Sequence, residues 1–406
     1  MSGEKTESVA HKPRLLMVST TFPRWEADAG PAPFVFDLAM SLRKHFEVTV
    51  LAPHYPSAAR HEVWNGVEIF RFRYLPDRYE TLASGEGIQN RIRKNPRERL
   101  KLIPFLAGEF FAGWNLLRKR RFHALNSHWM VPSGWIFARL ARKHQTPHFI
   151  TVHAADYFLL NRMTFGKALM RRIVKSARAV LPVNQRMADG IKQVCGDCSI
   201  QVMPMGFDPQ KFRSRDGNEV AKLREELSLS GKKIILFVGK LSEKKGVSNL
   251  VSAIKLLAND LPDSHLLIVG RGGYRPSLER LASRLGIGYR VRFIGAVPHQ
   301  KISAYYQLAD VVAVPSLPDQ FGETEGMPVV VLEALASGKP VVGSSYCSVP
   351  EPLKSGGFLE VEEPTPEALA AALKQVLNGE FQADFSAVDR YSWDQVARFY
   401  AEVMSV

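Results

Sequence analysis

The stretch Glu325-Gly-Met-Pro-Val-Val-Val-Leu-Glu333 places two carboxylates eight residues apart, at the start of an apolar run that continues towards Gly338. Pro328 fits where a helix begins, because its missing N–H would have no intrahelical partner there. Gly338 and the following Pro340 are residue types that end helices. The stretch therefore predicts a helix of about three turns, with one glutamate at its mouth and one further in.

The mouth of that helix is a predicted anion site. Backbone N–H groups before and within a first helical turn have no helical partner and lie at the positive end of the macrodipole, which favours a diphosphate. Here they belong to Gly326, Met327 and Val329. An offset of eight residues is about 80° around a helix axis, so Glu325 and Glu333 can face one side. On spacing alone, an exposed helix with two solvated glutamates explains the stretch equally well.

Two lysines follow a pattern that is typical of a buried parallel strand. Lys233-Ile-Ile-Leu-Phe-Val-Gly239 is an apolar run, and Lys240 and Lys245 come after it, before Gly246. Parallel sheets bind ligands at the carboxyl ends of their strands, so a turn with two cations predicts a phosphate clamp. Together with the helix mouth, the clamp favours a site for a sugar nucleotide.

These motifs resemble those of the retaining glycosyltransferases of family 4, which have the GT-B fold. The resemblance runs along nearly the whole chain in the same order. Lys240 and Lys245 match the basic pair that neutralises the donor diphosphate in that family. The first of the pair is commonly arginine, and lysine loses its bidentate fork. Gly270-Arg271-Gly272 resembles the family's Gly-x-Gly turn beside the nucleotide, so Gly270 and Arg271 are candidate donor contacts.

The resemblance also implies roles for single residues. It implies that Glu333 binds the ribose hydroxyls and that Glu325 contacts hydroxyls of the donor sugar. His153 and Asp156 match a His-Gly-x-Asp-like segment whose histidine contacts the transferred sugar, whereas Ala154 replaces the glycine. Without the resemblance, a histidine bonded to its neighbours at a strand end is the simpler interpretation. The expected catalytic residues are His153, Glu325, Lys240 and Lys245.

Two segments nearer the N-terminus match the family less well. In the family, the loop after the first strand is glycine-rich and approaches the donor phosphates; here it reads Asp28-Ala-Gly30 and continues with Pro31. Gly30 is kept as a candidate donor contact. The segment from Ser127 to Gly134 resembles one branch of the family, and its role in acceptor positioning or in packing stays open.

Strand and helix patterns alternate along the chain, which predicts the α/β class. A chain of 406 residues with 46% hydrophobic residues exceeds the size at which one core usually suffices. We expect two Rossmann-like domains that face a cleft, an acceptor-binding one at 1–208 and a nucleotide-sugar-binding one at 209–385. A last helix within 386–406 is expected to return to the first domain. The run from Arg14 to Pro23 is expected to be a buried strand that leads into a loop. Further strands are expected at 47–53, 67–74, 147–153, 177–183, 233–239, 265–270, 291–295, 310–314 and 340–343.

The activity that the resemblance implies is transfer of a hexose or N-acetylhexosamine from a UDP-sugar to a lipid-linked or envelope polysaccharide precursor, with retention of configuration. Lysines and backbone N–H groups would stabilise the leaving diphosphate. The chain has no Asp-x-Asp motif, and neither a metal nor another cofactor is expected. Two alternatives stay open: a soluble small-acceptor transferase or sugar-nucleotide epimerase on the same fold, and a non-enzymatic basic protein that binds membranes or nucleic acid.

Positive charge is concentrated in the first half of the chain. Residues 1–215 contain 34 Lys and Arg against 17 Asp and Glu; the totals of 54 and 40 leave 20 and 23 for residues 216–406. The segment from Arg91 to Arg121 holds 10 basic and 2 acidic residues around an apolar stretch. Such a segment suits an anionic membrane surface, or packs its apolar side and leaves the arginines solvated. No nucleic-acid-binding motif accompanies the charge, so no nucleic-acid partner is expected.

Three cysteines, Cys195, Cys198 and Cys347, do not make the even set of a disulfide-stabilised protein and fit a reducing compartment. Cys195 and Cys198 have zinc-knuckle spacing but no second pair, and we interpret them as ordinary thiols. The chain has no apolar run of 18 residues and a polar N-terminus. The sequence thus predicts a cytoplasmic protein, peripheral on the inner membrane face.

Overall fold

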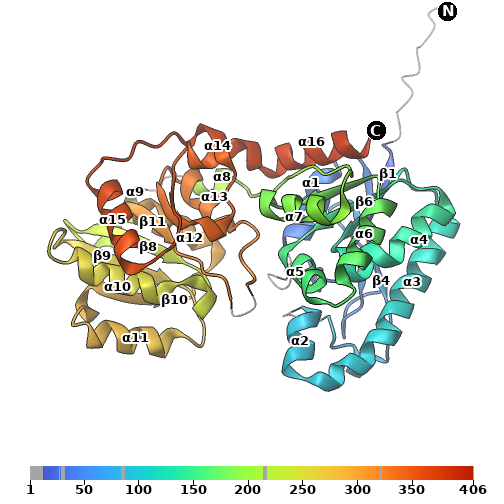
Figure 1. Ribbon diagram of the computed structural model, residues 1–406, viewed down its shortest axis with the longest axis horizontal. Helices are drawn as coiled ribbons and strands as arrows, with labels where there is room; N and C mark the ends of the chain where they lie inside the picture. Colours follow the sequence, from blue (N-terminus) through green and yellow to red (C-terminus); the bar gives the residue numbers. More distant parts are fainter. Residues whose placement is uncertain are drawn as a thin grey trace, which may run out of the picture. The chain divides into compact units, whose positions relative to one another are not determined.

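The computed structural model describes residues 12–26, 28, 33–83, 87–213, 217–319 and 322–405. The chain forms two compact units (Figure 1). Unit 1 contains Met1–Pro182, Ala188–Met203 and Val396–Val406, and unit 2 contains Val183–Met187 and Pro204–Gln395. Each unit is built on its own sheet, and Figure 1 shows helices around both sheets.

Unit 1 has a seven-stranded sheet in the order β3-β4-β2-β1-β5-β6-β7. All neighbouring strands pair in parallel except β3 and β4, which form an antiparallel edge. The strands are β1 (Arg14–Val18), β2 (Glu47–Pro53), β3 (His61–Trp64), β4 (Val67–Phe72), β5 (Ala124–His128), β6 (His148–Val152) and β7 (Ala179–Pro182). The strands predicted in this half are confirmed.

Strand β5 was not among the predicted strands, although it pairs with β1 and β6 inside the sheet. Its sequence, Ala-Leu-Asn-Ser-His, lacks the apolar run by which buried strands are recognised. The polar side chains are nevertheless buried, because neighbouring strands provide partners for them: Asn126 Nδ2 lies 3.1 Å from Thr151 Oγ1 on β6. Only the sheet neighbours explain why these residues form a central strand.

Helices cover this sheet with their apolar sides. Buried residues of α4 and α6 recur three and four positions apart, as a helix that packs on a sheet requires. The helices of this part of the chain are α1 (Pro33–Leu42), α2 (Ile88–Lys94), α3 (Leu102–Lys119), α4 (Trp135–His144), α5 (Ala154–Arg162), α6 (Gly166–Ser176), α7 (Gln185–Cys195) and, at the C-terminal end, α16 (Trp393–Met404).

The last helix, α16, packs on the sheet of unit 1 through a fully buried tyrosine. The Tyr400 hydroxyl lies 3.3 Å from Thr151 Oγ1 on β6, and burial raises the pKa of this tyrosine well above its ordinary value. The helix therefore contributes core side chains to a sheet that lies some 250 residues earlier in the chain.

Unit 2 has a six-stranded sheet in the order β10-β9-β8-β11-β12-β13, and all its strands are parallel. They are β8 (Lys233–Val238), β9 (Ser264–Val269), β10 (Val291–Gly295), β11 (Val311–Val314), β12 (Val341–Ser344) and β13 (Phe358–Val361). The five predicted strands are confirmed, and β13 was missed. The longer helices are α9 (Gly217–Glu226), α10 (Val247–Leu257), α11 (Arg275–Arg284), α12 (Ile302–Leu308), α13 (Val329–Ala336) and α15 (Pro366–Leu377); α8 (Gln210–Arg213) and α14 (Glu351–Lys354) are single turns.

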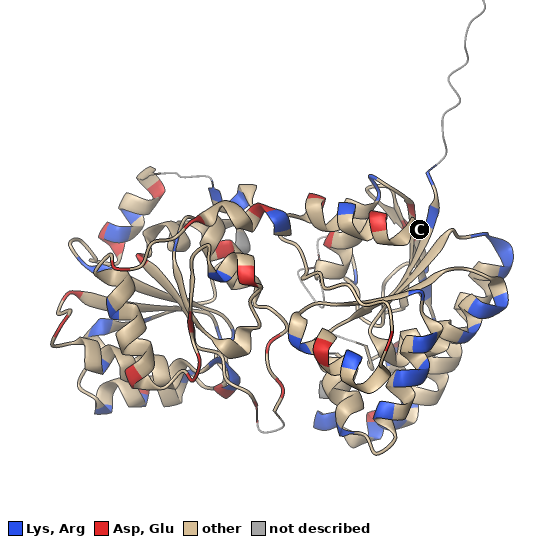
Figure 2. Cartoon of the chain, turned by 45° about the horizontal axis from the view of Figure 1, so that its top comes forward, with Lys and Arg blue, Asp and Glu red and all other residues tan. Residues whose placement is uncertain are grey.

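The basic segment from Arg91 to Arg121 has a packed part and an exposed part. Helix α3 buries Phe105, Leu116 and Leu117 in the core, so much of the apolar stretch is structural. Leu100, in the 3₁₀ helix Pro96–Lys101 that leads into α3, and Ile103, in the first turn of α3, are 80% and 78% exposed. In Figure 2, Lys and Arg residues, coloured blue, recur along the outer helices of this unit. Within the described residues, none of the helices combines the length and the apolar character needed to cross a membrane.

Glu109 on α3 is a fully buried carboxyl group without a cationic partner among the described residues. Ser133 Oγ donates a hydrogen bond to Glu109 Oε1 at 2.5 Å, whereas Oε2 has no partner there. Burial raises the pKa of Glu109 to about 7. The folded protein thus retains this proton at pH values at which the unfolded chain has lost it, and the free energy of unfolding falls as pH rises towards 7.

Replacing Glu109 by glutamine should remove this pH dependence. We expect the free energy of unfolding of the Glu109→Gln variant, relative to that of the wild type, to rise by about 2 to 3 kcal/mol between pH 5 and pH 8, at about 1.4 kcal/mol per pKa unit. Urea denaturation at both pH values measures it. Glu402→Gln, on the exposed side of α16, is the control and should change stability equally at both. An advantage for Glu109→Gln that does not grow with pH would contradict the assignment.

Candidate functional site

The predicted phosphate clamp lies where β8 ends. Lys240 follows the strand and is exposed, while Lys245 closes a short 3₁₀ helix, Glu243–Lys245. Lys245 Nζ lies 3.0 Å from Glu325 Oε1, and both side chains are about one-fifth exposed. Lys244 Nζ donates to the carbonyl of Thr324 at 3.1 Å. Two lysines thus bring the loop before α13 next to the carboxyl end of β8.

Glycines make this approach possible, because the backbones of neighbouring loops touch. A Cβ on Gly246, at φ +63°, would lie 1.8 Å from the carbonyl oxygen of Pro315. One on Gly270 would lie 1.8 Å from the carbonyl oxygen of Gly239, and one on Gly272 would lie 2.0 Å from that of Leu241. The Gly-Arg-Gly turn is therefore required by backbone packing, whatever it binds. Arg271 is exposed, and donor contacts of Gly270 and Arg271 stay predictions.

Helix α13 begins at Val329, with Pro328 as its N-cap residue. Glu325 lies in the preceding loop, so the angle of about 80° derived for two residues of one helix does not describe it. The Gly326 carbonyl accepts a hydrogen bond from Asn184 Nδ2. The N–H group of Val329 lies at the helix mouth, as predicted, while Gly326 and Met327 belong to the loop that leads into it.

Glu333 is held by a residue that sequence reasoning missed. Tyr306 on α12 donates its hydroxyl to Glu333 Oε2 at 2.6 Å, and the glutamate is only 9% exposed. Burial raises the pKa of Tyr306 well above its ordinary value, and the neighbouring Glu333 charge adds to the effect. The tyrosine thus remains a hydrogen-bond donor to the carboxylate. No sequence pattern links residues 306 and 333, because α12 and α13 meet only in the tertiary structure.

In unit 1, His153 follows β6 and forms a pair with His128, the last residue of β5. His128 Nδ1 lies 3.2 Å from His153 Nε2, and the two rings are nearly parallel. Burial lowers the pKa of both imidazoles, that of His153 to about 3, so both are neutral at neutral pH. His128 Nε2 is buried and has no hydrogen-bond partner among the described residues.

Asp156 fixes the position of His153. The His153 backbone N–H donates to Asp156 Oδ1 at 3.1 Å, and the His153 side chain accepts from the backbone of Asp156, so the two form a capping box at the start of α5. Met130 N–H donates to the same carboxyl group. Burial raises the pKa of Asp156 to about 7, against these N–H bonds, which lower it. Both ring nitrogens of His153 thus have protein partners, and its contact with a sugar stays a prediction.

Trp129 joins this group in a strained backbone conformation. Its φ is 71° and its ψ is 134°, values rare for a bulky side chain. Its ring lies 4.8 Å from that of His153, and the Phe34 ring lies 5.2 Å from His153 on another side. Strain of this kind is concentrated at functional sites. His128 and Trp129 of the segment from Ser127 to Gly134 thus lie together with His153 and Phe34, and this group is called the histidine site below. Gly30 lies outside the described residues.

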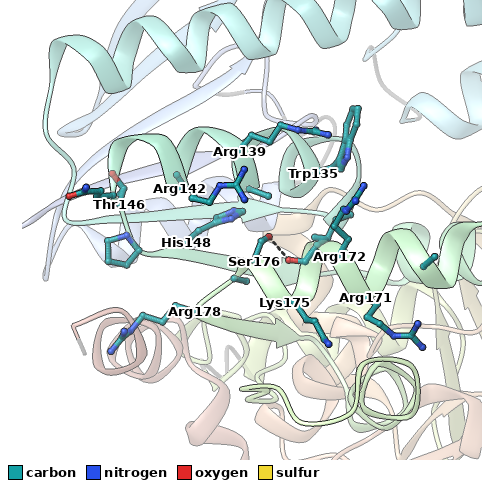
Figure 3. A pocket seen from close by; sticks show the side chains of 17 residues that line it. Trp135, Arg139, Arg142, Thr146, His148, Arg171, Arg172, Lys175, Ser176 and Arg178 are labelled. Atoms are coloured by element: carbon teal, nitrogen blue, oxygen red, sulfur yellow. Dashed lines mark hydrogen bonds between the residues drawn. The ribbon is translucent and has the colours of Figure 1, made fainter.

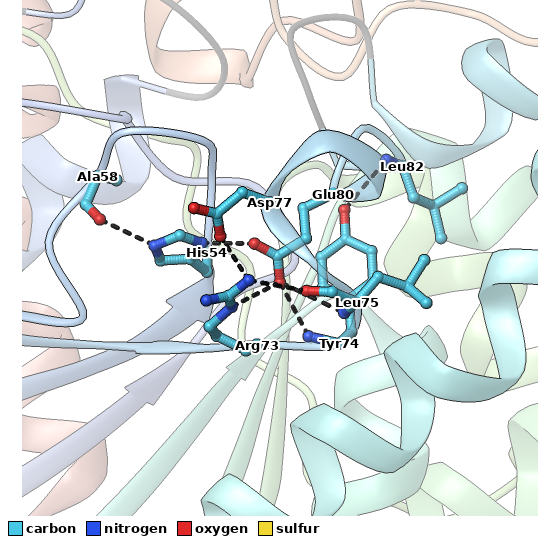
Figure 4. Close-up of polar contacts among 8 residues, drawn as sticks. All are labelled: His54, Ala58, Arg73, Tyr74, Leu75, Asp77, Glu80 and Leu82. Carbon is cyan, nitrogen blue, oxygen red and sulfur yellow. Dashed lines mark hydrogen bonds and ion pairs between the residues drawn. The ribbon is translucent and has the colours of Figure 1, made fainter.

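A separate cluster, His54, Asp77 and Glu80, is the group within the described ranges whose ligand atoms could meet at one metal ion. Figure 4 shows how its polar atoms are already used. His54 Nδ1 lies 2.5 Å from Glu80 Oε2, and His54 Nε2 lies 2.8 Å from the carbonyl of Ala58. Arg73 pairs with both acidic residues. The Arg73 guanidinium thus supplies the positive charge that a metal ion would bring to these two carboxylates.

Comparison with known sequences identifies the family. Residues 219–390 match Glycosyl transferases group 1, and residues 29–211 match Glycosyltransferase Family 4. An uncharacterized glycosyltransferase from Methanocaldococcus jannaschii is 31% identical over 377 residues, 88% of this chain and 94% of that protein. The chain belongs to the group 1 and family 4 glycosyltransferases.

Two further glycosyltransferases are similar to the chain. A putative teichuronic acid biosynthesis glycosyltransferase from Bacillus subtilis is 27% identical over 349 residues, 84% of this chain and 78% of that protein. A GDP-mannose-dependent alpha-(1-6)-phosphatidylinositol monomannoside mannosyltransferase from Mycolicibacterium smegmatis is 29% identical over 250 residues. That match covers 59% of this chain and 65% of the relative, just under two thirds of its length.

Solved structures of glycosyltransferases show the same GT-B architecture. Sucrose-phosphate synthase from Thermosynechococcus elongatus has a TM-score of 0.74 at 19% identity, and the match covers 97% of this chain and 98% of that one. Anabaena HepE in complex with UDP has a TM-score of 0.67 at 18% identity, and the match covers 97% and 99%. The predicted α/β GT-B fold is confirmed by these structures.

Replacing Tyr306 by phenylalanine tests the support of Glu333. The change leaves a nearly buried carboxylate short of a donor, and we expect the free energy of unfolding to fall by about 1.5 to 3 kcal/mol. Urea denaturation of the full-length protein measures this change in the free energy of unfolding. Tyr305→Phe, one position earlier on the same helix, is the control because Tyr305 is half-buried and the hydroxyl that donates to Glu333 Oε2 belongs to Tyr306. Equal stability of both variants would show that the hydrogen bond contributes nothing measurable.

Proposed function

We propose that this glycosyltransferase moves a hexose or N-acetylhexosamine from a nucleoside diphosphate sugar to a lipid-linked or polysaccharide acceptor, with retention of configuration. The observation that supports this most is the Lys245–Glu325 pair beside the mouth of α13. It unites a cation, a carboxylate and the positive end of a helix at the carboxyl edge of the unit 2 sheet, which suits the phosphates and the sugar of such a donor.

The donor diphosphate would be stabilised by charges already in place. Lys245 is held by Glu325 and Lys240 is exposed, so Lys240 can turn towards a phosphate while Lys245 exchanges its ion pair for one. The N–H groups at the mouth of α13 add a fixed positive dipole. Charge that develops on the leaving diphosphate is thereby neutralised without a metal, and attack from the leaving-group face would retain the anomeric configuration.

Glu333 and the histidine site would hold the sugar nucleotide and the acceptor. A Glu333 side chain held in place by the Tyr306 hydroxyl is a suitable partner for two ribose hydroxyls. His128 Nε2, which has no hydrogen-bond partner among the described residues, suits a hydroxyl of a sugar, whereas His153 would have to exchange one of its two partners for such a hydroxyl. A UDP-sugar is the first donor to test, since HepE is described in complex with UDP. A GDP-sugar is the second, since the Mycolicibacterium relative is described as GDP-mannose-dependent.

A lipid-linked acceptor is favoured by exposed apolar residues beside cations. Leu100, just before α3, and Ile103, in its first turn, are exposed. Arg97 and Arg99 are exposed next to them. The other end of α3 is basic but shows less apolar surface, and Arg120 there pairs with Glu68. We therefore place the proposed membrane contact at the beginning of the helix, where leucine, isoleucine and arginine can enter an anionic lipid surface together.

The donor site is tested by single substitutions of Lys240, Lys245 and Glu333. Loss of one charge-assisted contact is worth about 1.5 to 3 kcal/mol, so Lys240→Ala, Lys245→Ala and Glu333→Gln should each lower kcat/KM roughly tenfold to a hundredfold. The assay supplies radiolabelled UDP- and GDP-sugars and a polar-lipid extract, in excess EDTA. Lys255→Ala, an exposed lysine of the same unit, is the control. Full activity of all three variants, or activity that requires added Mg²⁺ or Mn²⁺, would refute the proposed site.

The membrane contact is tested by comparing the two ends of α3. Leu100→Ser with Ile103→Ser should release the protein from anionic vesicles, because insertion of each side chain contributes apolar burial of about 1.5 to 3 kcal/mol. Arg118→Glu with Lys119→Glu should weaken binding less and only at low salt. Vesicle co-sedimentation at two salt concentrations distinguishes them. If the Leu100 and Ile103 variant binds like the wild type, these residues do not contact lipid.

A further inference from the structure

A cavity of about 1070 Å³ lies in unit 1 between α4, α6 and the first residues of β6 and β7. Its wall includes Pro147 and His148 at the start of β6, and Ala177 and Arg178 before β7 (Figure 3). His153 follows the opposite end of β6, which is roughly 16 Å away for a strand of five residues. The cavity is therefore separate from the histidine site, on the other edge of the same sheet.

Six cations line this cavity, and no acidic residue does. They come in helical spacings from the facing sides of two helices, with one more before β7: Arg139, Arg142, Arg171, Arg172, Lys175 and Arg178. Within the described parts of the chain, none of the six forms an ion pair with a carboxylate. Like charges at these spacings repel each other, and the arrangement is stabilised when an anion lies among them.

Two of the cations are already oriented by the protein. The Arg139 guanidinium stacks 4.7 Å above the Trp135 ring, and Arg171 Nε donates to the carbonyl of Val194 at 3.0 Å. Four other cations line the same cavity, as the sticks in Figure 3 show: Arg142 on α4, Arg172 and Lys175 on α6, and Arg178 just before β7. A partly ordered set of arginines can grip a phosphate with paired N–H groups.

His148 adds a neutral polar group to the wall. It is only 2% exposed, and its Nε2 lies 2.9 Å from Ser127 Oγ. Its Nδ1 is buried and has no hydrogen-bond partner among the described residues. Burial lowers the pKa of this imidazole to about 3, so the ring is uncharged. When Ser127 donates its hydroxyl proton to Nε2, Nδ1 carries the ring proton and needs an acceptor, which a ligand oxygen would supply.

We propose that this cavity is a second anion site, which binds a ligand with a phosphate monoester or a diphosphate. Five arginines and one lysine match phosphate oxygens in charge and in hydrogen-bond geometry. The volume exceeds what a diphosphate needs, so there is space for the group that carries it. The site does not depend on the proposed donor site, which is built from residues of unit 2.

Phosphate of this kind has two sources, a soluble phosphorylated compound and the headgroup of a phosphorylated lipid. Both present the same oxygens to the arginines. They differ in whether the ligand comes with a membrane, so vesicles distinguish them.

Titration with inorganic diphosphate tests the anion site. The protein carries Lys245→Ala throughout, so that the unit 2 site contributes little binding. In this background we expect isothermal titration at low salt to show binding that Arg142→Gln, Arg172→Gln and Lys175→Gln together weaken at least about a hundredfold. These side chains are exposed, so the variant should fold normally.

The matched control removes three exposed charges elsewhere. Lys192→Gln, Lys255→Gln and Arg284→Gln together change the net charge equally but lie outside the cavity, and they should weaken binding less than about threefold. Equal weakening by both variants would show diffuse attraction to a basic protein and overturn the proposal, as would the absence of diphosphate binding in the parent protein. Neither result bears on donor turnover, which is measured with the wild-type unit 2.

Vesicles then identify the source of the phosphate. Vesicles of phosphatidic acid and of phosphatidylglycerol, matched in surface charge, are compared by co-sedimentation. Preference for phosphatidic acid that the Arg142, Arg172 and Lys175 variant loses supports a lipid headgroup in the cavity. Diphosphate binding without such a preference supports a soluble ligand. A variant that keeps both diphosphate binding and lipid preference refutes the site.

Discussion

Parallel strand pairing is the constraint on which both candidate sites depend. All strands of unit 2 and all but one of unit 1 run in the same direction as their neighbours, so their carboxyl ends meet at one edge of each sheet. Residues far apart in the sequence are therefore brought together at these edges. Lys245 meets Glu325 there in unit 2, and His128 meets His153 in unit 1. In unit 2 the approach is completed by glycines at positions where a Cβ would collide with a neighbouring backbone.

The two edges have opposite electrostatic character. The unit 2 edge carries partly exposed ions, Lys245 and Glu325, which can exchange partners with a charged ligand at little cost. At the unit 1 edge, His128, His153 and Asp156 are buried, and burial shifts each pKa towards the neutral form. A neutral, hydrogen-bonding surface suits hydroxyl groups, while the charged surface suits phosphates. The difference in burial thus matches the division between donor phosphates and sugar hydroxyls in the proposed reaction.

The two edges of the unit 1 sheet also differ in charge. One end of β6 leads to neutral histidines, and the other end begins at a cavity with six cations and no carboxylate in its wall. The positive charge of the first half of the chain is therefore not spread evenly over the surface. Part of it gathers on the facing sides of α4 and α6, and another part lies beside the exposed Leu100 and Ile103. Each concentration suggests its own anionic partner.

The sequence by itself determined the α/β class, most strands, and the order of the motifs that resemble the glycosyltransferases. Apolar runs such as Lys233–Val238 and glycine positions after strands are local properties, readable without neighbours. It also placed Lys245 and Glu325 in one site, since strand ends and helix mouths converge in parallel sheets. It also predicted that a helix begins near Pro328 with Glu325 at its mouth, as α13 does. The angle of about 80° between Glu325 and Glu333 was wrong, because Glu325 lies in the loop before the helix.

Only the tertiary structure decided the partners of buried polar groups. The Tyr306 donor for Glu333, the His128 partner of His153 and the strand formed by Ala124–His128 all depend on residues supplied by other elements. Polar residues such as Asn126 and Ser127 can lie in a central strand because the neighbouring strand supplies hydrogen-bond partners for their side chains. The six cations of the unit 1 cavity likewise face each other only because α4 and α6 pack side by side. Local periodicity encodes which face of an element is buried, and the packing of distant elements determines what that face meets.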